Sequence, residues 1–398
     1  MFRRLAVLTS GESHGRGLAV TVAGLPAGLE IDAGVVDAEL RRRQGGYGRG
    51  GRMKIEADRA DFLSGVRHGR TLGTPVTVLV WNRDWANWQE DMSPWPLTGG
   101  QRPSRPAVRK PRPGHADLAG ALKFGHRDIR DVLERASARE TAARVVAGAI
   151  CKQLLDALGI LVRSQVVAIG SVRAQPADLA DDGVWAAVEA SDVRCADEEA
   201  AAEMRTVIDR AREAGDTLGG IGEVVAVGVP PGLGSYATWG ERLDARLAAA
   251  LVSIPSVKAV EIGDGWAAAS APGSEVHDEI VIDDRRPWGT RRATNRAGGL
   301  EGGVTNGEPV VARVAFKPIP TLRRPLRSVD LDQGKAAEAH AERSDTCIVP
   351  AGCVVAEAMV AMVLADAVLE KFGGDNMSDL LAAHRHYIER LREIWGEQ

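Results

Sequence analysis

Two histidines stand in glycine-containing segments where a side chain could transfer a proton. His14 lies in GESHG (residues 11–15), a segment that also fits G-x-S-x-G, the pattern of an esterase nucleophile. That pattern requires a strand before the serine and a helix after it. Residues 18–25 are rich in β-branched side chains and predict a second strand instead. This context argues against Ser13 as a nucleophile. His14 remains the candidate, although a lone loop histidine is more often a surface residue.

The second histidine, His115, lies in RPGHAD (residues 112–117), where two prolines stiffen the approach. A rigid loop that carries Arg112 and His115 suits an anionic substrate and proton transfer. The alternative is a Gly-His turn that only caps a helix at Asp117.

A second misleading pattern, G-x-G-x-x-G, occupies residues 46–51. A dinucleotide fingerprint must follow a strand and open a helix, whereas this segment follows a predicted helix at 33–43. What remains is a turn that displays Arg43, Arg49 and Arg52, and guanidinium groups suit phosphate and carboxylate. Stabilisation of a helix C-terminus is the alternative for Arg43, but it does not cover Arg49 and Arg52.

A helix start forms a third anion-binding candidate. Ser137 and Glu140 read as a capping box for a helix over 138–158. The N-terminus of such a helix attracts anions, and Arg135 and Arg139 flank it.

Charge is distributed unevenly along the chain. Residues 1–150 carry 24 Lys and Arg against 16 Asp and Glu, while the remainder carries 26 against 38. This favours an anionic ligand held by the N-terminal part, although compositional bias toward arginine is the alternative. A nucleic-acid binder is disfavoured because the net charge is −4 and only 4% of residues are aromatic.

Strand and helix candidates occur without the regular β-α alternation of a parallel sheet, which favours an α+β fold with antiparallel sheets and packed helices. Strands are expected at 5–9, 18–25, 74–81, 222–229, 258–263 and 310–317, and helices at 33–43, 138–158, 201–214, 239–252, 354–372 and 378–394. We expect a single catalytic domain over residues 1–398 with a C-terminal helix at 378–394.

Residues 81–117 form a long Trp- and Pro-rich segment that we interpret as an ordered loop over a site, with a surface insertion as the alternative. No apolar run is expected to reach the length of a membrane span. Four cysteines without C-x-x-C pairing do not make a disulfide framework, so a cytoplasmic location is expected. No metal site is expected, because no Cys/His cluster has zinc spacing.

Eight segments together resemble the chorismate synthase family, in that family's order. They are GESHGRGL, RRQGGYGRGGRM, RPGHADLAG, RASARETAARVVAGA, VEIGDG, GGLEGGVTNG, KPIPTL and RSDTCIVPAG. The resemblance implies a 1,4-anti elimination of phosphate from 5-enolpyruvylshikimate 3-phosphate to chorismate, dependent on reduced FMN (FMNH2). It also implies a β-α-β sandwich, antiparallel sheets around central helices, that assembles as a homotetramer.

Matched position by position, the resemblance assigns a role to each site residue. His14 would be the general acid for the departing phosphate, His115 would protonate or polarise the flavin, and Asp345 would orient it. The implied substrate-binding residues are Ser13, Arg49, Arg52, Arg112, Arg139 and Arg343. The implied FMN-binding residues are Arg135, Ala136, Ser137, Pro255, Ser256, Gly302, Lys317, Pro318, Ile319, Pro320, Thr321 and Arg343.

Arg43 and Arg49 match positions that the family associates with NADPH as a reductant for the flavin. No appended reductase domain is recognisable in the sequence. A separate flavin reductase is therefore the alternative source of reduced flavin, and the expected partners include neither nucleic acid nor a membrane.

Overall fold

The computed structural model describes residues 2–50, 58–100, 102–341 and 345–393. Two antiparallel sheets form its main layers, in the strand orders β1-β2-β6-β3 and β10-β15-β9-β7-β8. The first sheet contains β1 (Ala6–Ser10), β2 (Gly17–Ala23), β6 (Val76–Trp81) and β3 (Asp61–Ser64). The second contains β10 (Val257–Ile262), β15 (Val310–Phe316), β9 (Gly220–Val227), β7 (Leu161–Ile169) and β8 (Val172–Arg173).

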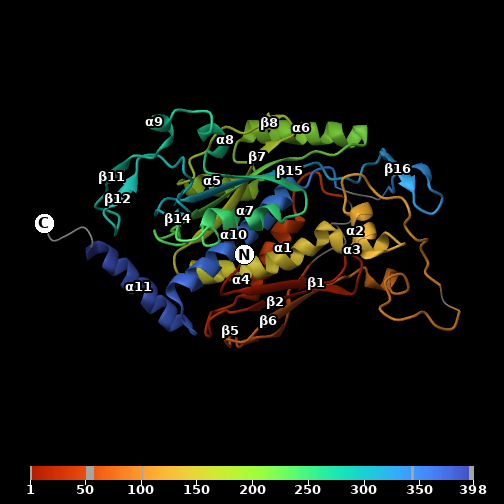
Figure 1. Ribbon diagram of the computed structural model, residues 1–398, viewed down its shortest axis with the longest axis horizontal. Coiled ribbons are helices and arrows are strands. Elements are labelled where there is room, and N and C mark those ends of the chain that lie inside the picture. The colour runs from red at the N-terminus through yellow and green to blue at the C-terminus, as the bar shows by residue number, and fades with distance from the viewer. Residues whose placement is uncertain (1, 51–57, 101, 342–344, 394–398) are drawn as a thin grey trace.

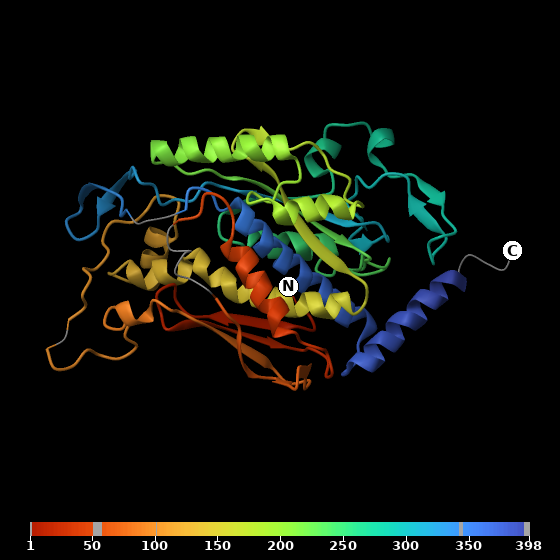
Figure 2. The same cartoon turned by 180° about the vertical axis from the view of Figure 1, so that it is seen from behind.

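Side-chain alternation orients the four-stranded sheet. In β2, Leu18, Val20 and Val22 are buried, while the residues between them face the other side. This period of two gives the sheet one apolar face, which packs against helix α4 (Thr141–Asp156). None of the described helices or strands covers the opposite face in Figures 1 and 2.

Three helices lie between the two sheets: α1 (Ala33–Gln44), α4 and α10 (Val349–Phe372) (Figure 1). α4 contacts the four-stranded sheet, α10 contacts β7 and β9, and the two helices pack against each other. They approach closely because Gly148 of α4 faces Ala358 of α10. A Cβ on Gly148 would lie 2.3 Å from the Ala358 Cβ, so a larger residue would push the layers apart.

Helix α10 is the central element of the core. Within the described residues it is long and apolar enough to span a membrane, with a mean hydropathy of 2.0, but that apolar window is entirely buried in the fold. The expectation that no apolar run reaches this length was wrong, because the helix begins at Val349 and not at 354. Its apolar sides face a helix layer and a sheet, which explains why it is hydrophobic all round.

Further helices cover the five-stranded sheet or extend from the body. α5 (Asp182–Ala190) and α6 (Glu198–Ala214) lie on its outer side, and α7 (Leu243–Val252) packs on β10 and α10 (Figure 2). α11 (Met377–Glu393) projects from the end of α10. The remaining short elements are β4 (Val66–Arg67), β5 (Arg70–Thr71), η2 (Trp85–Asn87), α2 (Asp117–Phe124), α3 (Arg130–Ala136), η3 (Ala138–Glu140), α8 (Gly265–Ala268), α9 (Gly273–Val276), β11 (Ile280–Ile282), β12 (Thr290–Arg292), β13 (Leu300–Glu301), β14 (Val304–Thr305), β16 (Arg327–Asp330) and β17 (Lys335–Glu338).

Two local predictions differ from the structure. The sequence interpretation omits β7, which lies between β9 and β8, is mostly buried and lacks simple alternation. It also places a capping box at residues 137–140. In the structure Ser137 accepts from the Arg139 N–H at 3.3 Å, but Glu140 binds Thr9 and Arg144, and α4 begins only at Thr141.

Candidate active site

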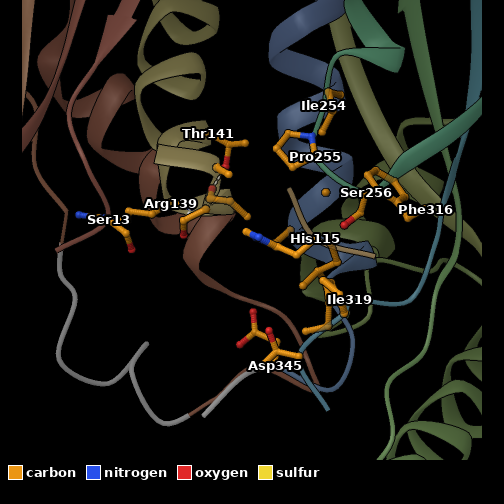
Figure 3. A pocket seen from close by; sticks show the side chains of 18 of the residues that line it. Ser13, His115, Arg139, Thr141, Ile254, Pro255, Ser256, Phe316, Ile319 and Asp345 are labelled. Carbon is orange, nitrogen blue, oxygen red and sulfur yellow. Dashed lines mark hydrogen bonds between the residues drawn. The ribbon is translucent and has the colours of Figure 1, made fainter. Parts of the chain in front are cut away.

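A cavity of about 700 Å³ lies where the β1–β2 loop, the start of α4, the start of α10 and the turns after α7 and β15 meet. Figure 3 shows Ser13 and Arg139 on one side, Pro255, Ser256 and Phe316 on the other, and His115 between them. The predicted site residues that line the cavity are Ser13, His14, Arg43, Arg49, Arg112, His115, Ala136, Ser137, Arg139, Pro255, Ser256, Lys317, Ile319, Pro320, Thr321 and Asp345. The volume is in the range of small-molecule sites.

His14 is held by Glu134 of α3. Its Nδ1 lies 2.9 Å from both carboxylate oxygens of Glu134, and its backbone N–H donates to the same carboxylate. The Glu134 side chain is only 1% exposed. Because a carboxylate at Nδ1 favours a proton on that nitrogen, we assign chemistry toward the cavity to Nε2.

The loop that carries Ser13 and His14 depends on Gly11. Gly11 has a φ of +102°, and a Cβ there would lie 2.4 Å from the carbonyl oxygen of Gly17. Ser13 is 3% exposed, and its N–H donates to the carbonyl of Glu134. The loop joins two antiparallel strands, so it lacks the strand-to-helix turn of a nucleophile elbow.

His115 belongs to a compact group with Arg112 and Asp117. His115 Nδ1 lies 2.5 Å from Asp117 Oδ1, and Arg112 Nε donates to Asp117 Oδ2 at 2.8 Å. Arg112 also donates to the hydroxyl of Thr321. Burial alone would raise the pKa of Asp117, but hydrogen bonds from His115 and Arg112 outweigh it and hold the pKa well below its usual range. Asp117 therefore stays ionised and fixes both side chains.

Two further cavity arginines also have carboxylate partners. Arg139 binds Asp58 through two hydrogen bonds of 2.5 and 2.7 Å, and both residues are buried. Arg49 lies 3.0 Å from Asp345, which also accepts from the N–H of Gly50. These pairs hold the guanidinium groups in place before an anion arrives.

The side chain of Arg43 extends from α1 to the start of α4. Its Nε donates to the hydroxyl of Thr141, and one terminal nitrogen donates to the carbonyl of Ala138. The side chain thus links the end of α1 to the first turn of α4 at the cavity wall.

Two turns form the opposite wall. Ser256 has a φ of +74°, in the left-handed region where a side chain other than glycine is strained. Its carbonyl accepts from the N–H of Lys317, whose Nζ donates to the carbonyl of Gly114. Burial lowers the pKa of Lys317, and Lys258 lowers it further. A strained non-glycine residue held against a cavity is a candidate ligand clamp.

Several predicted residues are not placed at the cavity. The guanidinium of Arg135 donates to the carbonyls of Gly11 and Thr9, so it ties α3 to the β1–β2 loop. Gly302 lies in the β13–β14 hairpin near Tyr236, and Pro318 is not among the lining residues although its neighbours are. Arg52 and Arg343 lie outside the described residues.

Sequence reasoning missed the carboxylate partners Glu134, Asp117 and Asp58, as well as Arg323 in the cavity wall. Only Asp117 had a local signal, because it stands two residues after His115. Glu134 and Asp58 reach their partners across long sequence separations, and nothing in the local pattern marks them.

Comparison with known proteins shows the family of the chain. The family model described as chorismate synthase matches residues 5–369. A chorismate synthase from Desulforudis audaxviator is 57% identical over 389 residues, 98% of each chain. One from Symbiobacterium thermophilum is 58% identical over 387 residues, covering 96% of this chain and 98% of that relative. A crystal structure of chorismate synthase aligns with a TM-score of 0.78 at 40% identity, covering 98% of this chain and 99% of that chain. The chain therefore belongs to the chorismate synthase family of lyases.

Proposed function

We propose that the chain catalyses the 1,4-anti elimination of phosphate from 5-enolpyruvylshikimate 3-phosphate, giving chorismate, in this cavity. The reaction is the last step of the shikimate pathway toward the aromatic amino acids. The observation that carries the proposal is the meeting of two histidine–carboxylate pairs with several arginines in one cavity of a chain of this family. A substrate with two carboxylates and a phosphate needs this density of cationic donors.

The cavity residues fit reduced FMN as the cofactor. Ala136 and Ser137, between α3 and α4, line the cavity, Lys317 supplies a cation, and the turn at Ser256 presents strained backbone. We assign the flavin to these residues together with Pro255 and residues 318–321, and Arg135, Gly302 and Arg343 stay proposed contacts from the family pattern. When bound, reduced FMN would supply electron density to the departing phosphate, with no net redox change.

The protein's own residues bind the anions and move protons. Arg49, Arg112 and Arg139, with the hydroxyl of Ser13, hold the substrate, and Arg52 and Arg343 are proposed to join them. His14 donates a proton from Nε2 to the leaving phosphate oxygen and becomes neutral, while Glu134 orients the ring and stabilises the imidazolium before the transfer.

His115 and Asp345 are assigned to the flavin. Asp117 and Arg112 orient His115 toward the cavity, and Arg49 and the Gly50 N–H orient Asp345. We propose NADPH at Arg43 and Arg49, or a separate flavin reductase, as the source of reducing equivalents.

We further propose that the chain is a cytoplasmic single-domain β-α-β sandwich that assembles as a homotetramer. Support comes from the outer face of the four-stranded sheet, where Leu8 is 74% exposed and Trp81 is 44% exposed. Large exposed apolar residues on an uncovered sheet face favour contact with another copy.

The test is anaerobic phosphate release from 5-enolpyruvylshikimate 3-phosphate. We expect release with pre-reduced FMN and none with oxidised FMN. Turnover without any flavin would contradict the proposal. Covalent labelling of Ser13 by an esterase probe would favour the serine-hydrolase alternative, and a salt-dependent RNA mobility shift would favour nucleic-acid binding.

A further inference from the structure

The indole of Trp88 lies against the imidazole of His14. The two ring centroids are 3.8 Å apart, and the ring planes differ by 21°. The Cζ of Arg105 also lies 3.8 Å from the Trp88 ring. Two groups this close cannot share one face of a ring without overlapping. His14 and Arg105 therefore lie on opposite faces of Trp88, in a three-layer stack.

Hydrogen bonds anchor Trp88, Arg105 and the segments beside them. Trp88 Nε1 donates to Asp84 at 2.9 Å, and the amide of Asn82 donates to the carbonyl of Gly15, next to His14. Arg105 donates to Asp91 at 2.5 Å, and the Asp91 side chain is 2% exposed. The segment from Asn82 to Arg105 is therefore tied to the loop that carries the histidine.

We propose that Trp88, backed by Arg105, is a positioning residue that holds the imidazole of His14 for proton transfer. This inference rests on the proposed function, in which His14 is the proton donor. Glu134 contacts the ring at Nδ1, and a contact at one ring atom does not by itself fix the tilt of the ring plane. Nε2 is at the far side of the ring and moves most in such a tilt. A flat indole face restricts the tilt because leaving it loses stacking contact.

A purely structural role explains the arrangement less well. Trp88 is half-buried and belongs to none of the apolar core clusters of the described residues. Its closest aromatic contact is with a catalytic candidate rather than with an aliphatic core. Trp95 on the same loop is 77% exposed and provides a matched control.

The kinetic test compares Trp88→Ala, Trp88→Phe and Trp95→Ala under anaerobic conditions with reduced FMN. We expect Trp88→Ala to lower kcat about 10- to 100-fold with KM within about twofold, since a misplacement near 1 Å costs on this order. Trp88→Phe should stay within about threefold of wild type, and Trp95→Ala should match it. Equal kcat values for Trp88→Ala and Trp95→Ala would overturn the proposal.

A double-mutant cycle with His14→Ala tests whether Trp88 acts through the histidine. In that background Trp88→Ala should cause no further loss, and an undiminished second loss would refute the positioning role. A readout without turnover is the NMR signal of the His14 ring protons, which stacking should shift upfield. Trp88→Ala should abolish this shift and Trp88→Phe should largely keep it. An unshifted signal in the wild type overturns the inference, whereas missing turnover with a shifted signal counts only against the proposed function.

Discussion

The two histidines of the cavity are each paired with a buried carboxylate, but the pairs are built differently. His115 and Asp117 lie two residues apart, and Arg112 of the same segment donates to both oxygens of Asp117. His14 and Glu134 are 120 residues apart, and the stacking ring of Trp88 comes from a third segment. The His115–Asp117 pair depends on one short segment, whereas the His14–Glu134 pair depends on the packing of three segments.

The two carboxylates also differ in how their charge is compensated. Asp117 accepts hydrogen bonds directly from Arg112, whereas the guanidinium of Arg130 lies 3.6 Å from the carboxylate of Glu134. A less compensated carboxylate suits a histidine that must carry a proton to a leaving group. A carboxylate shared with arginine suits a histidine that must keep a fixed orientation.

The largest effect is expected at His14. His14→Ala should lower the single-turnover rate of phosphate release with pre-reduced FMN about 10²- to 10⁴-fold, because a positioned acid contributes this much. FMN should still bind, since its assigned contacts are other residues. An inactive Ser13→Ala beside a nearly normal His14→Ala would restore the nucleophile interpretation.

Asp117→Asn should chiefly affect stability. Removing one partner of a buried ion pair typically costs about 3–5 kcal/mol, because the Arg112 charge is left uncompensated. The measurement is the free energy of unfolding in urea for wild type and variant. The depressed pKa of Asp117 means that its stabilisation is present above the ordinary value near pH 4 and is lost as pH falls below it. The difference between the two proteins should be constant above about pH 5 and shrink below about pH 4; a difference that grows on acidification would contradict the assignment.

Glu134→Gln tests the second histidine–carboxylate pair, that of His14. The variant keeps the shape of the side chain but removes the charge that faces His14, so kcat should fall about 10- to 100-fold with a smaller change in KM. The loss in stability should be smaller than for Asp117→Asn, since no direct hydrogen bond to an arginine is broken. Unchanged kcat would contradict the role assigned to the Glu134 charge.

The smallest effect is expected for Ser13→Ala. Its hydroxyl is assigned one hydrogen bond to the substrate, so kcat/KM should fall by no more than about tenfold. Steady-state kinetics with the same reduced FMN gives the comparison with His14→Ala. A loss as large as that of His14→Ala would assign Ser13 to the chemistry.

Local sequence patterns predicted several of the strands and helices. The β-branched residues of 18–25 predicted the strand that the structure has as β2, and the predicted helix at 33–43 corresponds to α1. The sequence interpretation omitted β7 because a mostly buried strand loses its alternation of apolar and polar residues. It predicted the start of α4 too early because the Glu140 side chain binds Thr9 and Arg144 and does not complete a capping box. Those outcomes depend on neighbours that local sequence does not reveal.

The sequence by itself determined which residue types could do chemistry and which segments carry them. The glycine loop with His14, the rigid segment from Arg112 to Asp117 and the residues around Ser137 that precede α4 were all visible as local signals. Only the tertiary structure decided the partners: Glu134 and Trp88 for His14, Asp58 for Arg139, and the link from Arg43 to α4. The physical reason is that hydrogen bonds and stacking act over a few ångströms, whereas the partners stand tens to more than a hundred residues apart. Packing of the helix layer between two sheets closes those separations.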